Sequence, residues 1–289
     1  MDTVLNTGPP GDTRTQRAFS GQALHGDDFT PAEIERWFED EREGYFNLYH
    51  RDTETPPAAA AAAEAPYTYE ALAWLHGFRW LPARTYEHAL GVGSAHGAEL
   101  KPVLQRAQRV TVLEPSDGFA ATTIGGKPVD YVKPQASGLM PFADASFDFI
   151  VCFSVLHHIP NVSTVLREMQ RVVKPGAHVL LREPTHSMGD WRGPRRGLTK
   201  NERGIPLPLF RRMIDEAGFR VLRETRCMFS LTTRLEPLLG RPVWTVPWVV
   251  HADAALCRLP LWPRHYHATR LWQKFRPTGV AYVLEKPAA

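Results

Sequence analysis

Cysteine and net charge are both scarce in this chain. Three of its 289 residues are cysteine (Cys152, Cys227 and Cys257), and no two of them form a CxxC pair. This excludes a disulfide framework, argues against a structural zinc site and is typical of a reducing compartment, so we expect a cytoplasmic protein. Lys and Arg number 34 against 31 Asp and Glu, a net charge of +3, which alone does not indicate a nucleic-acid partner.

Long hydrophobic runs are also missing. The first thirty residues are polar, so we expect no signal peptide. The most apolar stretch, residues 235–262, predicts no membrane span because ionisable residues and prolines interrupt it. The interrupting ionisable residues are Arg241, His251, Asp253 and Arg258. With 43% hydrophobic and 22% charged residues, the composition is that of a globular protein with one large domain or two smaller ones.

Short apolar runs alternate with helical patterns from about residue 85 onward. Helical periodicity covers residues 162–173 and 209–217. The expected strands are residues 86–90, 109–113, 147–153, 178–181, 219–222 and 279–284. This alternation predicts an α/β fold, with a doubly wound and mostly parallel sheet covered by helices on both faces.

The pattern divides the chain into four regions. Residues 1–28 lack periodicity and predict a flexible arm, and residues 29–84 predict a helical lid. The sheet core takes residues 85–226 and 279–289. Between its two parts, residues 227–278 form an insertion rich in aromatic side chains.

The first helix of the predicted lid has a clear start. Thr30 can cap it, Pro31 suits the first helical position and Glu33 completes a capping box. The Ala- and Pro-rich residues 54–66 predict a linker or a frayed helix. Residues 69–78 predict a second helix with several aromatic side chains.

Glycines and an acid follow the first two strands. Gly91 and Gly93 come after the first strand, and Glu114 ends the second. In open α/β sheets, ligands bind at the carboxyl ends of the strands, where glycines let the backbone approach and a carboxylate can accept hydrogen bonds from a ribose diol. His96 stands where a dinucleotide fingerprint needs its third glycine, which argues against a nicotinamide enzyme. Taken singly, the two glycines would also fit a tight turn that binds no ligand, and Glu114 would also fit an acid on the protein surface.

A longer run carries a family resemblance. The segment LMPFADASFDFIVCFSVLHHI, followed by VLREMQRVVKPGAHVLLREP, resembles the S-adenosylmethionine-dependent class I methyltransferases. The resemblance covers residues 85–225 and 279–286, with several separated motifs in the family's order and spacing. It implies a seven-stranded sheet whose last strand is antiparallel, a Rossmann-like methyltransferase fold. It also implies a glycine-rich loop around the methionine part of S-adenosylmethionine and an acid on the ribose.

Three alanines depart from the family pattern. Ala89 stands where the family usually has an acid before the loop, and Ala95 replaces the third loop glycine. Ala136 stands where an acid often reads the adenine amine, and a neighbouring side-chain amide, hydroxyl or backbone group could replace that acid. The cofactor-binding residues that the resemblance implies are Gly91, Val92, Gly93, Glu114, Pro115, Gln135, Ala136, Ser137, Phe153 and Ser154.

Three histidines follow later strands and are candidate catalytic bases. His157 and His158 come after the fourth strand, and His186 follows the fifth. An ordinary imidazole pKa suits removal of a proton from an oxygen or nitrogen acceptor. The pair has an equally good structural explanation, in which one ring packs under the helix and the other hydrogen-bonds to the backbone. His186 could likewise be an ordinary exposed histidine of a loop. Adjacent histidines point in different directions and no third ligand is evident, so we predict no metal site.

Two variable segments bear on the acceptor. The loop of residues 192–203 can bind an anionic substrate through its cations, or it is a solvated loop with Glu202 as partner. Its cations are Arg192, Arg195, Arg196, Lys200 and Arg203. The insertion of residues 227–278 can cap the acceptor pocket, rest on a membrane near a lipid-linked acceptor, or form a small core or a dimer contact.

Together these features predict an enzyme that transfers a methyl group. It would move the methyl of S-adenosylmethionine to an oxygen or nitrogen of a small molecule or a saccharide. An RNA or protein methyltransferase is a rival, but the basic loop lacks the interleaved aromatics that favour RNA. A non-catalytic member of the fold that binds a partner is the other rival, motivated by the three alanines.

Overall fold

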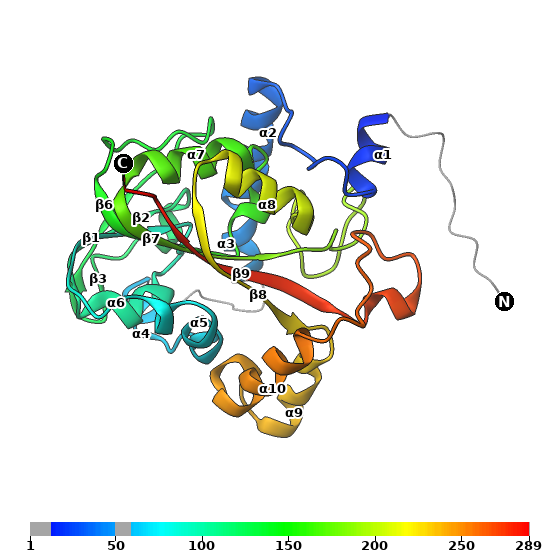
Figure 1. The fold of residues 1–289 in the computed structure, drawn as a ribbon. Coiled ribbons are helices and arrows are strands. Elements are labelled where there is room, and N and C mark those ends of the chain that lie inside the picture. The colour runs from blue at the N-terminus through cyan, green and yellow to red at the C-terminus, as the bar shows by residue number, and fades with distance from the viewer. Residues whose placement is uncertain (1–12, 50–58, 289) are drawn as a thin grey trace.

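The computed structural model describes residues 13–49 and 59–288, and a seven-stranded sheet forms its centre (Figure 1). The strand order is β5-β2-β1-β6-β7-β9-β8, with β9 antiparallel to both neighbours and the other pairings parallel. Its strands are β1 (Tyr86–Val92), β2 (Ala107–Leu113), β5 (Asp130–Val132), β6 (Phe147–Phe153), β7 (Val173–Pro184), β8 (Arg220–Phe229) and β9 (Pro277–Glu285). A separate two-stranded pair joins β3 (Thr123–Ile124) to β4 (Lys127–Pro128). The predicted fold class is therefore confirmed, including the antiparallel last strand.

Helices cover both faces of this sheet (Figure 1). They are α1 (Thr13–Phe19), α2 (Pro31–Arg42), α3 (Gly44–Tyr49), α4 (Ala59–Glu64), α5 (Glu70–His76), α6 (Lys101–Leu104), α7 (Val162–Val172), α8 (Leu207–Glu216), α9 (Glu236–Leu239) and α10 (Pro247–Cys257). Successive side chains of β7 point to opposite faces of the sheet, so alternate residues pack against different helices. Val179 and Leu181 join the core under α7 and α8, whereas Leu180 joins the opposite core with residues of α5 and α6.

Strand β8 is longer than the sequence indicates. The expected strand ends at Leu222, but pairing with β9 continues to Phe229, which lies opposite Pro277. As an edge strand, β8 leaves much of its surface in water, and Arg220 and Val221 are both exposed. Because few of its residues are buried on either face, its hydrophobic pattern is weak and the prediction stops early.

The prediction of a flexible arm is wrong over residues 13–28. This segment forms α1, and Leu24 lies in the core of the sheet's α7–α8 face. Asp27 also accepts hydrogen bonds from the backbone N–H of Ser163 at 2.8 Å and from its hydroxyl at 2.6 Å. These contacts are tertiary, so no local periodicity in the sequence predicts them. The first part of the predicted arm, residues 1–12, lies outside the described residues.

The rest of the predicted lid follows the expected helices. Thr30 caps α2 and forms the capping box with Glu33, as predicted. The end of the Ala- and Pro-rich stretch forms α4, where Ala63 is buried, while residues 54–58 lie outside the described residues. The helix expected over residues 69–78 is α5, followed by a short 3-10 turn.

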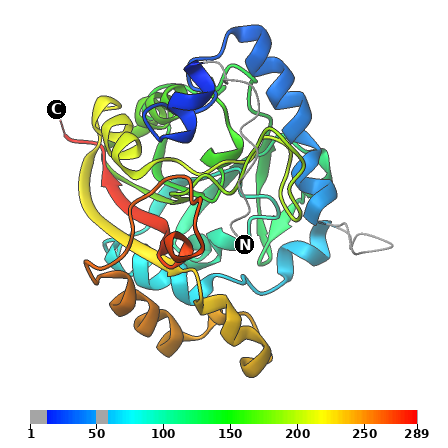
Figure 2. The same ribbon diagram turned by 90° about the vertical axis from the view of Figure 1, so that its right-hand side faces the viewer.

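The insertion between β8 and β9 forms a small core against α5. Trp244 and Val249 are buried there with Leu72 of α5. Only the two ends of the segment, at Met228 and Thr278, reach the large cavity described below. In Figure 2, α9 and α10 (gold to orange) lie together at one end of the molecule. Among the described residues, no helix has both the length and the apolar character needed to cross a membrane.

The second half of the insertion supports the loop that follows β7. The hydroxyl of Tyr266 donates to the carbonyl of Gly204 at 2.7 Å, and His267 lies 2.8 Å from the hydroxyl of Ser187. The carbonyl of Tyr266 in turn accepts hydrogen bonds from the backbone N–H of Ser187 and from Arg276. The loop of residues 185–206 is thus held in place from the insertion side, beside the carboxyl ends of the strands.

Candidate active site

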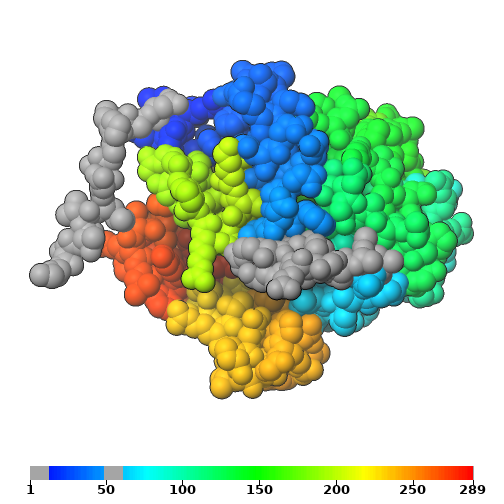
Figure 3. Space-filling model, turned by 180° about the vertical axis from the view of Figure 1, so that it is seen from behind, coloured from blue at the N-terminus to red at the C-terminus, as the bar shows by residue number. Residues whose placement is uncertain are grey.

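A cavity of about 700 Å³ lies at the carboxyl ends of β1, β2, β6 and β7. Its floor is built from the residues that end these strands. Helices α2 and α3 form one wall, with Trp37, Glu41 and Tyr45 among its lining residues. Figure 3 shows these helices, in blue, between the yellow-green loop of residues 185–206 and the green part of the core.

Glycine is favoured at two positions, one at the end of β1 and one in the loop that follows it. A Cβ on Gly93 would lie 2.3 Å from Val155, and the residue has a φ of +63°. A Cβ on Gly91 would lie 2.4 Å from the hydroxyl of Ser94. Ala95, which replaces the third family glycine, is held in the left-handed region with a φ of 44°. The hydroxyl of Tyr131 donates to the Ala95 carbonyl at 2.9 Å and fixes the loop in this strained conformation.

Glu114 connects this loop to the end of β2. One carboxylate oxygen accepts the backbone N–H of Ala95 and the other accepts that of Ser116, both at 3.1 Å. The side chain is buried and lines the cavity. Burial raises its pKa to about 7, against the lowering effect of the two backbone hydrogen bonds. Each oxygen keeps a lone pair that a ligand hydroxyl can use.

Most of the cofactor-binding residues that the resemblance implies lie at this cavity. Those that line it are Val92, Gly93, Glu114, Pro115, Gln135, Ala136, Phe153 and Ser154. Two do not line it. Gly91 lies beneath Ser94, and Ser137 is exposed, with its carbonyl accepting a hydrogen bond from Asn161.

Two charged residues of the cavity wall carry no motif that sequence analysis could use. Glu99 is buried beside the glycine loop and accepts a 2.6 Å hydrogen bond from the hydroxyl of Ser94, and burial raises its pKa to about 7. Arg182 lies near the end of β7 and is buried, with its guanidinium carbon 4.8 Å from the ring centroid of Tyr69 and 4.6 Å from that of Phe153. For Arg182 the available signal was a charged residue near the end of a strand, because that edge of a parallel sheet is where sites form. Glu99 lies in a 3-10 turn and lacks even that signal.

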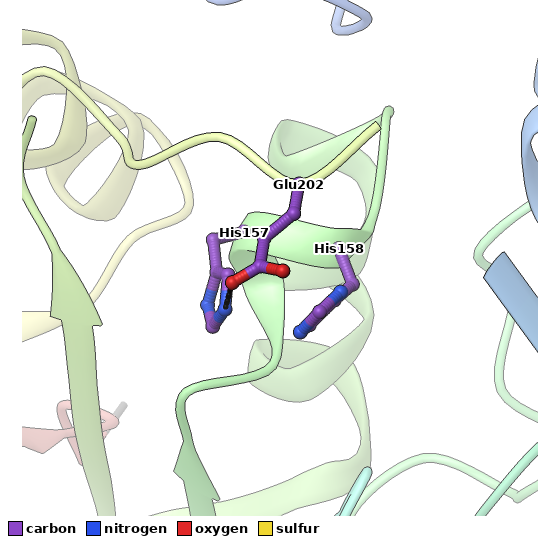
Figure 4. Close-up of side chains that lie close together, drawn as sticks. All are labelled: His157, His158 and Glu202. Atoms are coloured by element: carbon purple, nitrogen blue, oxygen red, sulfur yellow. Dashed lines mark ion pairs between the residues drawn. The ribbon is translucent and has the colours of Figure 1, made fainter. Parts of the chain in front are cut away.

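His157 is held between two carboxylates. Its Nδ1 lies 2.7 Å from Glu183, and its Nε2 lies 3.4 Å from Glu202 (Figure 4). Burial alone would lower the pKa of this imidazole, but the two acids raise it to about 9. At neutral pH the ring is therefore already protonated. It cannot serve as the general base that the sequence suggested, unless that proton is replaced.

His158 faces the cavity from the same turn. Its Nδ1 lies 3.0 Å from Glu41 of α2 and 3.2 Å from the hydroxyl of Thr199. Trp37 donates from its indole to the His158 carbonyl at 2.6 Å. The side chain is 16% exposed, so the ring is oriented by its neighbours while part of it stays accessible.

His186 is a different kind of group. Its Nδ1 lies 3.3 Å from the carbonyl of Thr278, and the residue lines the cavity. Burial lowers its pKa to about 4, helped by the positive charge of Arg276. The ring is neutral at physiological pH but is a weak base. None of the three histidines is the freely exposed loop residue that the sequence also allowed.

A third side chain that could bind a metal lies beside the histidine pair, although none is evident from the sequence. Glu202 reaches His157 and His158 from the loop after β7, and one ligand atom from each of the three residues lies within 4.8 Å of the others. Figure 4 shows the carboxylate between the two rings. The sequence could not reveal this group because Glu202 lies 44 positions after His158 in the chain.

The basic loop uses its cations within the protein. Arg192 pairs with Asp190, and Lys200 with Asp40 of α2, both at 2.6 Å. Arg195 donates to backbone carbonyls of the same loop. The loop therefore presents no cluster of free guanidinium groups to an anionic substrate. The basic loop therefore no longer supports an RNA substrate either.

The charge on His157 makes a testable contribution to stability. The pKa is near 6.5 for an ordinary histidine and about 9 in the folded protein, so stability is fully present below pH 6.5 and is lost as the pH rises to 9. We expect a loss on the order of 3 kcal/mol over this range. Urea unfolding at pH 7 and pH 9 measures it. In His157→Gln most of the difference should vanish, and an equal difference in both proteins would contradict the assignment.

Comparisons with known proteins find methyltransferases among the relatives of this chain. Residues 90–181 match the family model described as a methyltransferase domain. A ubiquinone biosynthesis O-methyltransferase of Dechloromonas aromatica is 32% identical over 100 residues, which is 33% of this chain and 43% of that protein. A demethylmenaquinone methyltransferase of Bacillus velezensis is 52% identical over 44 residues, 15% of this chain and 19% of that protein. The chain thus spans less than half the length of these curated relatives.

A solved structure shares the fold over a greater length. The crystal structure of the [4+2]-cyclase SpnF covers 86% of this chain and 97% of its own, with a TM-score of 0.52 and 14% sequence identity. At this identity the likeness concerns the fold alone. Any activity must be argued from the cavity and its side chains.

Proposed function

Since this chain belongs to the class I S-adenosylmethionine-dependent methyltransferase family, we propose that it transfers the methyl group of S-adenosylmethionine to a small-molecule acceptor. One observation carries the proposal. Gly93, where a side chain would meet Val155 at a positive φ, and the buried carboxylate of Glu114 meet at one cavity. In this reading residues 85–226 and 279–289 hold the cofactor, and residues 29–84 cover it.

The residues present suit the cofactor. The bare backbone at Gly93 leaves room for the methionine part, and the free lone pairs of Glu114 suit the two ribose hydroxyls. Gln135 and Ala136 line the wall proposed for the adenine, where the Gln135 amide replaces the missing acid. A cavity of about 700 Å³ is large enough for the cofactor and a modest acceptor.

The protein's task is mainly to position the two reactants. S-adenosylmethionine, when bound, supplies an electrophilic methyl group on its sulfonium. Phe153 and Ser154 end β6 beside the glycine loop and are proposed to set the floor on which the acceptor meets that group. Holding reacting atoms about 3–3.5 Å apart in line accounts for much of the rate gain in such a reaction.

The wall of the cavity favours a flat and largely apolar acceptor. Aromatic side chains line this wall. They come from the N-terminal helices, from the segment before α5, and from β6: Trp37, Phe38, Tyr45, Tyr67, Tyr69 and Phe153. Aromatic walls of this kind bind ring-shaped ligands with defined geometry. The relative from Dechloromonas aromatica is named for ubiquinone biosynthesis and O-methylation. Both observations favour an oxygen acceptor on an aromatic ring over a saccharide.

His158 is the histidine proposed to activate that acceptor. His157 is protonated already and His186 is a weak base, whereas His158 is oriented by Glu41 and reaches the cavity. Activation here means helping the acceptor hydroxyl lose its proton before or during transfer.

Cofactor binding and turnover test the proposal together. We expect S-adenosylhomocysteine to bind in titration calorimetry and to raise the unfolding temperature. With radiolabelled S-adenosylmethionine, a catechol or hydroquinone should acquire label. A [4+2]-cyclase structure has a similar fold, so the fold does not decide this point. Absence of heat and of a thermal shift would overturn the proposal in favour of a non-catalytic protein that binds a partner.

Replacing His158 separates its role in turnover from cofactor binding. In His158→Ala we expect kcat to fall about 100-fold, the usual scale for a group that assists proton removal. The affinity for S-adenosylhomocysteine should change little, because Glu114 and the glycine loop are untouched. His251→Ala, an exposed histidine on α10, is the matched control. Equal activity in both variants would make His158 structural.

A further inference from the structure

We propose that His157, His158 and Glu202 bind a divalent transition-metal ion on the wall of the cavity. The ion would hold the hydroxyl of the acceptor at this point. The role of the ion toward the acceptor rests on the proposed methyl transfer, whereas the binding of the ion does not. No motif in the sequence indicates a metal; the arrangement of the three side chains in space is what points to one.

One distance in the group matches a metal site, and the others are close to it. Nε2 of His157 lies 3.4 Å from a carboxylate oxygen of Glu202. Two ligands that each lie about 2.1 Å from a tetrahedral ion are separated by about 3.4 Å. One nitrogen of His158 completes the group, and the three ligand atoms lie within 4.8 Å of one another. The side chains therefore need only small adjustments to meet at one ion.

Each ligand is oriented by an outer partner. Glu183 accepts from Nδ1 of His157 at 2.7 Å, which leaves Nε2 for the ion. Glu41 lies 3.0 Å from Nδ1 of His158. The second oxygen of Glu202 accepts the backbone N–H of Thr199 at 2.9 Å. Carboxylates behind ligating histidines fix the ring and its tautomer in known metal sites, and these partners would do the same.

The nearby cations leave these ligand atoms free. Arg203 directs its hydrogen bonds to five backbone carbonyls, and Arg195 also donates to carbonyls of its loop. Nε2 of His157 and a carboxylate oxygen of Glu202 face each other as an ion pair at 3.4 Å. A divalent ion would bind both groups in place of the proton on Nε2.

The ligand set indicates the ion and its accessibility. Two imidazoles and one carboxylate suit Zn²⁺, Fe²⁺ or Co²⁺ better than Mg²⁺, which prefers oxygen ligands and water. Three protein ligands leave a fourth position open, as in catalytic zinc sites. His157, His158 and Glu202 all line the cavity, so that position faces the place proposed for the acceptor.

An ion at this point would act on the acceptor as a Lewis acid. Coordination of the acceptor hydroxyl favours its ionised form, and the released proton passes to solvent water. No other reagent is required. This would assign His158 the role of a ligand that activates the acceptor through the ion.

Cobalt titration tests the site directly on the full chain. After dialysis against a chelator, Co²⁺ should bind with a stoichiometry of one per chain and give the visible absorption of a tetrahedral site, and Zn²⁺ should displace it. Glu202→Gln keeps the size of the side chain and the hydrogen bond to Thr199 but removes a charged ligand. We expect it and His158→Ala to lose the absorption, while His251→Ala keeps it. Binding of S-adenosylhomocysteine by each variant shows that it is folded.

The outcomes separate this inference from the proposed function. No cobalt binding, or equal binding in Glu202→Gln and the wild type, would overturn the metal site. Full methyl transfer after removal of the metal would overturn its role on the acceptor. In both cases binding of S-adenosylhomocysteine would leave the methyltransferase proposal standing, since that proposal depends on the other end of the cavity.

Discussion

Replacing Glu114 with alanine is expected to weaken the binding of S-adenosylhomocysteine about 30-fold. The carboxylate lines the cavity with one backbone N–H on each oxygen. Its remaining lone pairs are proposed to accept the two ribose hydroxyls, and losing both hydrogen bonds costs about 2 kcal/mol. Titration calorimetry on the wild type and the variant measures the change in Kd.

Two controls separate recognition of the ribose from support of the loop. Glu114→Gln keeps the size of the side chain but replaces one acceptor by a donor, so we expect a smaller loss. Burial raises the pKa of Glu114 to about 7, so wild-type affinity should rise between pH 6 and pH 8 as the carboxylate ionises. That rise should be absent in Glu114→Gln. An unchanged Kd in the alanine variant would remove Glu114 from the binding site.

Replacing Arg203 with methionine is expected to cause the largest loss of stability. The side chain is fully buried, and its three guanidinium nitrogens donate to the carbonyls of His25, Leu156, His157, Ile159 and Pro160 at 2.8 to 3.2 Å. Burial lowers the pKa of Arg203 to about 10, which leaves it charged at neutral pH. Methionine fills part of the space but removes the guanidinium donors. The carbonyls of Leu156 and His157 keep a backbone N–H donor, whereas those of His25, Ile159 and Pro160 lose the hydrogen bonds that Arg203 supplies.

We expect the free energy of unfolding of Arg203→Met to fall on the order of 4 kcal/mol, because each unpaired buried carbonyl costs about 1–3 kcal/mol. For a domain of this size the unfolding temperature would fall by roughly 10 °C. Arg196→Met, on the exposed part of the same loop, is the matched control. A similar small change in both variants would show that the hydrogen bonds of Arg203 contribute little.

The fold could be predicted because its determinants are local. The buried parallel strand β6 is a nearly continuous apolar run, and the apolar residues of α7 recur with helical periodicity up to Val172, next to the start of β7. The register of Glu114 at the end of β2 follows from the same pattern. The edge strand β8 was underestimated because water covers much of it.

The part of the site around the histidines could not be predicted, because it depends on tertiary contacts. Glu41 comes from α2, Glu202 from the loop after β7, and the histidines from the turn after β6. In sequence each is an ordinary polar residue. Arg203 shows the same limit, since it looks like one cation of a solvated loop and is a fully buried side chain.

The carboxylate of Glu41 has a consequence for how ligands enter and leave. From α2 it accepts hydrogen bonds from Thr199 at 2.6 Å and from the backbone of Asn201 at 2.8 Å, and it also holds His158. A covering helix tied down in this way cannot swing aside without breaking all three contacts at once. We therefore expect rare, concerted opening events on this side, so that product departure rather than bond making sets the pace of each catalytic cycle.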